Sequence, residues 1–121
     1  LQELNLTHNK LSELSSRIEN LKNLYRLYLG GNVLSTLPSV IGSLQYLETV
    51  NLFDNRIIEL PPEITYFGGL IRLFLDYNLL SSIPLTDSPE YLEWENLEEL
   101  HLSGNKLGQL PNAIGNLWAL K

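Results

Sequence analysis

Hydrophobic and polar residues alternate in short stretches that are spaced regularly along the chain. Leu4-Asn5-Leu6 is the first of them. A period of two places both leucines on one side of an extended strand and the residue between them on the other. The same alternation recurs at residues 27–29, 50–52, 73–75 and 100–102. We therefore expect five short strands that all run in one direction and form a parallel sheet, whose inner face must be covered.

The residues that would cover this sheet follow each strand. Leu37, Ile41 and Leu44 are separated by four and three residues. This spacing suits an irregular or 3₁₀ turn and is too short for a full helix. The pattern therefore predicts a layer of turns packed on the inner face of the sheet.

A single repeat accounts for both patterns and occupies the whole chain. The frame L-x-x-L-x-L-x-x-N-x-L occurs five times, first as LQELNLTHNKL and last as LEELHLSGNKL, with Val50 and Ile57 as the substitutions at its leucine positions. The frame returns every 23 residues, except for one interval of 27, and a period of this length is the signature of a solenoid. The predicted repeats are 1–23, 24–46, 47–69, 70–96 and 97–119.

Repeat 70–96 carries a four-residue insertion between Leu85 and Glu90. Ser88-Pro89-Glu90 is typical of the start of a helix, so we expect a helical turn over about 89–95. Tyr91 and Trp94 would then face the core.

One asparagine recurs at the same place in every repeat. Where the chain turns from the strand into the interior, backbone groups lose their ladder partners. A buried carboxamide has two donors and an acceptor, so it can satisfy groups on its own repeat and the next. We predict a structural asparagine ladder made of Asn9, Asn32, Asn55, Asn78 and Asn105.

These motifs resemble the leucine-rich repeat family over essentially the whole chain. The second half of the repeat, LPSVIGSLQYL in residues 37–47, is similar to the intracellular class with a 23-residue period, which includes Ras-pathway scaffolds, plant Ras-group repeat proteins and polarity scaffolds. The resemblance implies an α/β solenoid with a curved parallel sheet on its concave face and 3₁₀, short helical or irregular turns on its convex face. It also implies a non-catalytic, cytoplasmic protein-interaction module or scaffold in signalling or complex assembly.

Two other readings of the function stay open. The chain could be the repeat region of a larger multidomain enzyme, such as a kinase, a cyclase or a ubiquitin ligase. It could also be a segment of an extracellular or cell-surface receptor. Leu1 begins a strand unit without a polar cap and Leu120 stands where a sixth unit would begin, so we expect the same array to continue at both ends.

The outward-facing positions of the strands are the candidate partner-binding site. Large aromatic side chains stand there, flanked by arginine, and both residue types are frequent in binding hot spots. The alternative is that these aromatics simply pack on one another across the strands. On the concave face we predict the following partner-binding residues: Arg26, Tyr28, Asn51, Phe53, Asp54, Arg72, Phe74, Asp76, Tyr77 and His101.

Charge narrows the class of partner. The net charge of −6 argues against nucleic acid, and no apolar run is long enough to insert into a membrane. Seven of the acids lie in residues 73–105 without any Lys or Arg. This stretch is read first as a solvated face and second as a docking site for a basic partner. The possible acidic patch on the convex face comprises Asp87, Glu90, Glu93 and Glu95.

The sequence offers little material for catalysis or for a cofactor. It has no cysteine, no phosphate-binding glycine loop and no nucleophile motif, so we expect neither an enzyme nor a bound cofactor. His8 and His101 are too many repeats apart to share a metal ion. Asp54 and Asp76 lie on adjacent repeats, but isolated acids on an open sheet usually stay solvated. We therefore predict no metal site.

Overall fold

The computed structural model describes residues 1–85, 94–110 and 114. Within them the chain alternates short strands with single 3₁₀ turns. In chain order the elements are β1 (Glu3–Asn5), η1 (Ser16–Asn20), β2 (Arg26–Tyr28), η2 (Ser39–Ser43), β3 (Thr49–Asn51), η3 (Pro62–Tyr66), β4 (Arg72–Phe74) and β5 (Glu99–His101).

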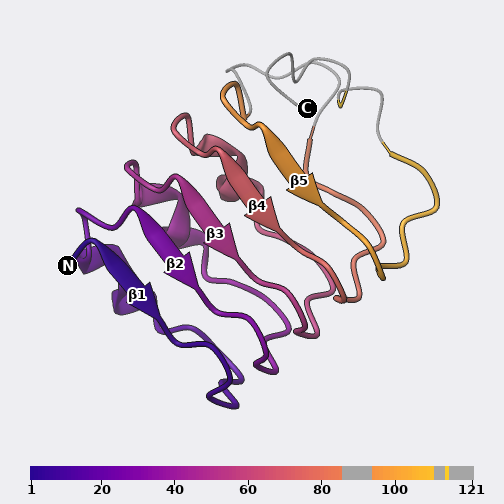
Figure 1. The fold of residues 1–121 in the computed structure, drawn as a ribbon, viewed down its shortest axis with the longest axis horizontal. Coiled ribbons are helices and arrows are strands. Elements are labelled where there is room, and N and C mark those ends of the chain that lie inside the picture. The colour runs from indigo at the N-terminus through magenta and orange to yellow at the C-terminus, as the bar shows by residue number, and fades with distance from the viewer. Residues whose placement is uncertain (86–93, 111–113, 115–121) are drawn as a thin grey trace.

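The strands form one parallel sheet whose spatial order is the chain order, β1-β2-β3-β4-β5 (Figure 1). The register is one to one, so that Leu4, Leu27 and Val50 are aligned across three strands. The parallel sheet is as predicted. Each strand begins and ends one residue earlier than expected, although the residue after it still belongs to the ladder: the N–H of Leu6 donates to the carbonyl of Tyr28 at 2.8 Å.

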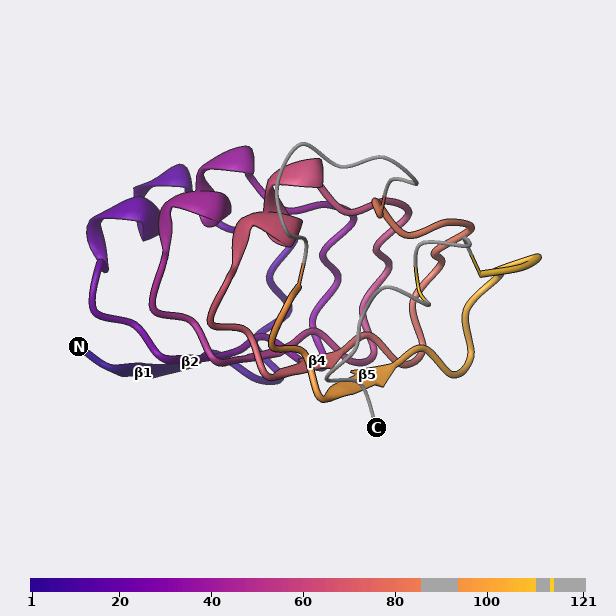
Figure 2. The ribbon, with the colours of Figure 1, turned by 90° about the horizontal axis from the view of Figure 1, so that it is seen from above.

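The 3₁₀ turns lie on the opposite side of the molecule from the strands (Figure 2). Each turn buries one isoleucine at the same place in the repeat, namely Ile18, Ile41 and Ile64. These side chains pack with the inward leucines of the strands in one continuous core. The predicted two-layer solenoid is therefore confirmed, and its second layer consists of the 3₁₀ turns that the spacing predicted.

The asparagine ladder fixes the turn after each strand. The carboxamide oxygen of Asn55 accepts from the N–H of Leu34 at 3.0 Å, and its nitrogen donates to the carbonyls of Leu29, Leu52 and Phe53. The remaining bonds of Asn55 go to the preceding repeat. The sequence had led us to expect bonds to the next repeat, and this direction was wrong. Equivalent bonds to the preceding repeat are made by Asn32, Asn78 and Asn105.

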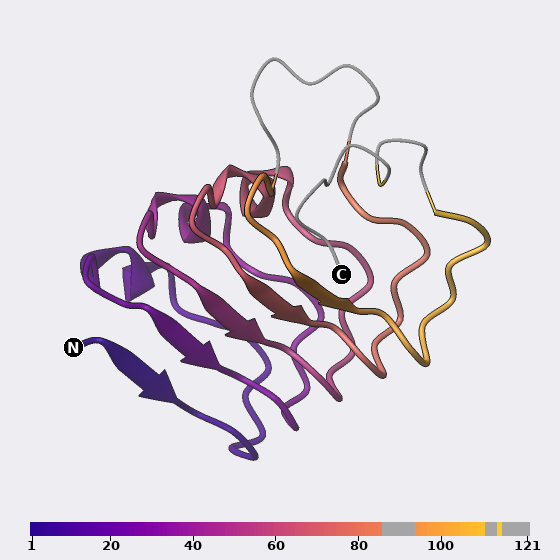
Figure 3. The same ribbon diagram turned by 45° about the horizontal axis from the view of Figure 1, so that its top comes forward.

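The residue just before each ladder asparagine has a left-handed backbone. Figure 3 shows the chain turning beyond the carboxyl end of each strand. Two repeats place glycine there, which adopts a positive φ at no steric cost. In the other three repeats a residue other than glycine adopts this conformation. The five residues are His8, Gly31, Asp54, Tyr77 and Gly104.

Trp94 is fully buried, as expected for a residue that faces the core. Its indole N–H donates to the carbonyl of Ile64 in η3 at 3.0 Å. The predicted helical turn over 89–95 falls largely outside the described residues. Its last two positions are not helical, because Trp94 has a φ of +46° and begins a turn.

Candidate functional site

The face of the sheet that points away from the core is the open sheet face, and it carries most of the predicted site. Its central row consists of side chains at the fifth place of the repeat. The one-to-one register aligns Tyr28, Asn51, Phe74 and His101 across β2 to β5. Tyr28, Asn51 and Phe74 are half-buried by their neighbours, while His101 is exposed.

The rings of Phe74 and His101 stack at one end of this row. Their centroids are 4.7 Å apart and their planes are inclined by 32°. The Nε2 atom of His101 also lies 3.5 Å from the carboxylate of Glu99 in the same strand. Phe74 stays half-buried beside this contact, so part of its side chain remains accessible to solvent.

A second ring pair forms near the other end of the sheet, between His8 and Phe53. Their centroids are 6.3 Å apart with an edge-to-face geometry. The two rings come from the first and third repeats and meet over the second, where Gly30 and Gly31 stand. A Cβ on either glycine would overlap one of these rings. The two rings can therefore pack closely on the backbone of this repeat only because both residues are glycine.

Sequence reasoning missed His8 as part of this pair. The signal was present, because two successive glycines at outward positions leave room for side chains from both neighbouring repeats. The backbone of Phe53 is held by Asn51, whose carboxamide oxygen accepts the N–H of Phe53 at 3.1 Å. Asn51 thus positions Phe53 besides contributing to the surface itself.

The two arginines of the predicted site pair with acids on adjacent strands. Arg26 lies 3.6 Å from Glu3, and Arg72 lies 3.6 Å from Glu99. All four side chains are about half exposed, so each pair contributes little to stability. Thr49 lies between the two arginines in the register and is buried, unlike the arginines on either side of it.

Three predicted residues lie where the chain leaves β3 and β4. Asp54 and Tyr77 are exposed, and Tyr77 keeps 65% of its surface accessible while its ring lies against Gly104. Asp76 is half-buried, and its carboxylate accepts the N–H of Ser103 at 2.9 Å. These residues form the rim of the open sheet face.

The possible acidic patch on the convex face can be placed only at Glu95. Asp87, Glu90 and Glu93 lie outside the described residues. Glu95 is half-buried and its carboxylate lies next to Gly68 in the loop after η3.

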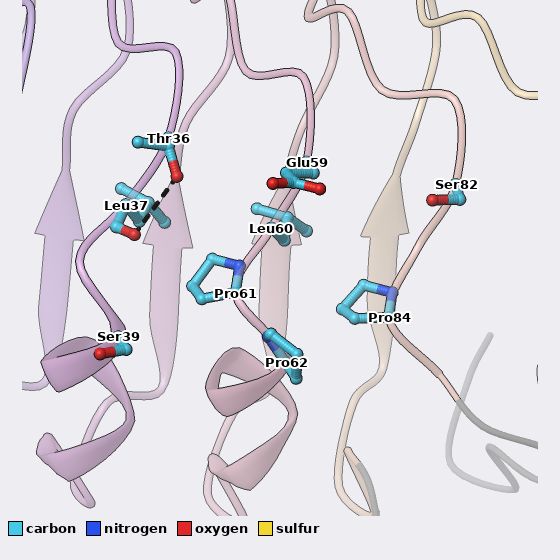
Figure 4. Close-up of a pocket in the computed structure, with 9 residues that line it drawn as sticks. All are labelled: Thr36, Leu37, Ser39, Glu59, Leu60, Pro61, Pro62, Ser82 and Pro84. Atoms are coloured by element: carbon cyan, nitrogen blue, oxygen red, sulfur yellow. Dashed lines mark hydrogen bonds between the residues drawn. The ribbon is translucent and has the colours of Figure 1, made fainter.

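A shallow pocket of about 390 Å³ opens on the flank of the array, between the strands and the 3₁₀ turns (Figure 4). Three prolines line it, and its one acid is Glu59. The hydroxyls of Thr36, Ser39 and Ser82 also line it, but no histidine or lysine does, so the pocket lacks a base that would activate a hydroxyl for catalysis. None of the predicted site residues lines this pocket.

Two further observations concern the described residues. They contain no group of three or more His, Cys, Asp or Glu side chains that could hold a metal ion. None of their helices has the length and apolar character needed to cross a lipid bilayer.

The repeat, the parallel sheet and the 3₁₀ turns together define a leucine-rich repeat protein, and the chain belongs to the leucine-rich repeat family. Leucine-rich repeat models match residues 1–57 and 96–117. The fold is that of a protein-interaction module, a class that is typically non-catalytic.

Two solved structures of this fold cover nearly the whole chain. Internalin C2 of Listeria monocytogenes is 26% identical with a TM-score of 0.83, and 99% of this chain matches 49% of that one. A leucine-rich repeat protein of Leptospira interrogans is 27% identical with a TM-score of 0.72, and this chain spans 36% of it.

A curated relative is known from sequence. The adenylate cyclase of Schizosaccharomyces pombe is 51% identical over 51 residues, which is 41% of this chain and 3% of that protein. The chain thus spans less than half the length of each of these relatives.

Proposed function

We propose that this chain is a non-catalytic interaction module that binds a protein partner on its open sheet face. The observation that carries the proposal is the set of aromatic rings on a face that no part of the described chain covers. Tyr28, Phe53 and Phe74 are half-buried, and Tyr77 is exposed at the rim. A surface that meets only solvent gains no stability from such rings, whereas a binding surface gains affinity from them.

Preorganisation adds to this argument. Association usually loses free energy when side chains at an interface become fixed. Phe74 is already stacked on His101, and Phe53 already rests against His8 over two glycines. Both phenylalanines can therefore contact a partner with little further loss of conformational entropy.

The first prediction tests Phe74. The partner is identified by affinity purification of the full-length protein with mass spectrometry, and its affinity is then measured for the wild type and for Phe74→Ala. Losing an aromatic hot spot costs about 2 kcal/mol or more, so we expect roughly thirty-fold weaker binding. The melting temperature should fall only slightly, because Phe74 is half-buried and loses one stacking contact.

Tyr46→Ala is the matched control. Tyr46 is 51% exposed in the loop between η2 and β3, so this variant removes an aromatic away from the open sheet face. Its affinity should equal that of the wild type. If neutralising Glu90, Glu93 and Glu95 abolished binding while Phe74→Ala retained it, the partner would bind the convex face and the proposal would be wrong.

A second candidate function is that the array is the repeat region of a larger enzyme. The 51% identity to a segment of an adenylate cyclase supports it. The two candidates are compatible, because the repeats would then recruit a partner to a catalytic domain elsewhere in the protein. Sequencing the full gene tests the second candidate, since a cyclase domain would be encoded in the same reading frame.

The proposal extends to the setting. We place the module in the cytoplasm, in the assembly of signalling complexes. The cysteine-free sequence and the resemblance to the intracellular repeat class support this setting.

A further inference from the structure

The charged residues of the open sheet face fall into two sets, of which the first is a row. This row stands at the third place of the repeat and contains Glu3, Arg26, Arg72 and Glu99. Each arginine lies 3.6 Å from one of the glutamates, so this row is formally neutral and its charges are matched within the chain. It leaves no net charge for a partner to complement.

The second set stands at the rim, with Asp54 at the eighth place of its repeat and Asp76 at the seventh place of the next. Asp54 and Asp76 stand on adjacent repeats, and the N–H of Asp54 donates to the carbonyl of Asp76 at 2.8 Å. Among the described residues neither carboxylate has a cationic group within 4.0 Å, although Arg56 stands only two residues beyond Asp54. The unmatched charge of the open sheet face is therefore negative and concentrated at these two repeats.

Aromatic rings stand on both sides of the two carboxylates. The ring of Phe53 leans over Gly30 toward the first repeat, and the ring of Tyr77 leans against Gly104 toward the fifth. Along the axis of the array the two acids thus lie between two rings that diverge. The planar guanidinium of arginine can form paired hydrogen bonds to carboxylates and can also stack on aromatic rings. The ammonium group of lysine pairs with carboxylates less specifically.

We propose that the partner presents a basic segment whose arginine side chain pairs with Asp54 and Asp76, in the part of the rim that the rings of Phe53 and Tyr77 flank. This inference rests on the proposed function and specifies the chemistry of the partner. The net charge of −6 favours approach of a basic segment to this chain. Arg26 and Arg72 then form ion pairs with Glu3 and Glu99 across adjacent strands and do not pair with the partner.

Asparagine substitutions at both positions isolate the charge from the fold. Asp54 has a φ of +53°, a conformation that asparagine accepts readily. At residue 76 the carboxamide of asparagine keeps an oxygen that can accept the N–H of Ser103. Asp54→Asn with Asp76→Asn should therefore fold like the wild type and lack both charges.

The test uses a displayed library of random short peptides selected on the wild-type chain. We expect the selected peptides to be enriched in arginine. Synthetic copies should bind the double variant Asp54→Asn/Asp76→Asn at least about tenfold more weakly, and the loss should shrink at high salt. The matched control is Glu13→Gln/Glu59→Gln, which removes two exposed acids elsewhere and should bind like the wild type.

The other outcomes contradict the inference in distinguishable ways. Selected peptides without arginine, or an equal loss in the control variant, overturn it. Peptides that bind the double variant as well as the wild type but fail to bind Phe74→Ala overturn it as well, and leave the proposed function standing. Peptides that bind the double variant and Phe74→Ala as well as the wild type contradict both.

Discussion

Asn55 shows at the scale of one residue how the array is held in register. Its carboxamide takes part in four hydrogen bonds, two of them within repeat 47–69 and two with repeat 24–46. The side chain is buried, so the backbone groups that it satisfies have no water to replace it. Its role is structural and lies at the junction of two repeats.

The second prediction follows from these bonds. Asn55→Leu should lower the free energy of unfolding by roughly 1–3 kcal/mol, because it leaves buried backbone groups unsatisfied. Urea unfolding followed by circular dichroism measures the change. Asn9→Leu is the control: Asn9 is exposed and its side chain donates one bond, to the carbonyl of Thr7, so the loss of stability should be much smaller. Equal losses in the two variants would contradict the ladder.

The ladder was predictable from the sequence and the ring contacts were not. Five asparagines at one place in the frame indicate a buried carboxamide, but recurrence alone does not say whether it reaches forward or backward along the array. The rings of His8 and Phe53 meet over a repeat that contains neither of them. Such a contact depends on side-chain torsions, which the alternation of polar and apolar residues does not specify.

At the scale of elements, η3 is held in place by a residue of the following repeat. Trp94 fills the core beside it, and the indole N–H donates to the carbonyl of Ile64 within the turn. A single 3₁₀ turn has few hydrogen bonds of its own, so such a contact contributes much of its stability. The asparagine at residue 96 adds a bond of 2.6 Å to the carbonyl of Gly68.

The third prediction concerns this contact. Trp94→Phe should destabilise the chain by roughly 1–3 kcal/mol, because the carbonyl of Ile64 loses its buried donor. Tyr46→Phe removes a polar group from another, exposed aromatic ring and should change stability by less than about 0.5 kcal/mol. Thermal unfolding of the two variants compares them. A Trp94→Phe protein as stable as the control would show that the bond contributes nothing.

The elements themselves follow closely from the sequence because the strand frame is encoded five times, and in three of the described repeats a 3₁₀ turn follows the strand. A period of two marked the strands and a spacing of four and three marked the 3₁₀ turns, and both are present. The observed strands begin and end one residue before the predicted ones. The leucine pattern indicates which side chains are buried, whereas the ends of a strand are set by backbone hydrogen bonds to its neighbour. Trp94 was correctly placed in the core, but its turn carries a backbone that no helix has.

At the scale of the whole molecule, every element contacts its counterparts in adjacent repeats. The η2 turn packs on η1 and η3, and β3 pairs with β2 and β4. In such an array stability is approximately a sum of terms within repeats and terms between neighbours. Energetic coupling between two substitutions should therefore depend on the number of repeats between them.

The fourth prediction is that coupling disappears beyond adjacent repeats. Ile41 and Ile64 are fully buried in neighbouring turns, so Ile41→Val and Ile64→Val together should deviate from additivity by about 0.5 kcal/mol or more. Ile18→Val with Ile83→Val changes the first and fourth repeats and should be additive within about 0.5 kcal/mol. Double-mutant cycles from urea unfolding measure both. Equal coupling in the two cycles would mean that the array responds as one undivided core.

The one-to-one register of the strands also makes the array a ruler. Each repeat advances the outward row by one strand spacing, about 4.8 Å, whereas one turn of an α-helix advances by about 5.4 Å. A straight helix laid along the five strands slips by roughly 0.6 Å per repeat, or about 2.4 Å over four intervals. A helical ligand can thus stay in phase with two or three neighbouring repeats, and a longer one must bend, tilt or break to follow the rest.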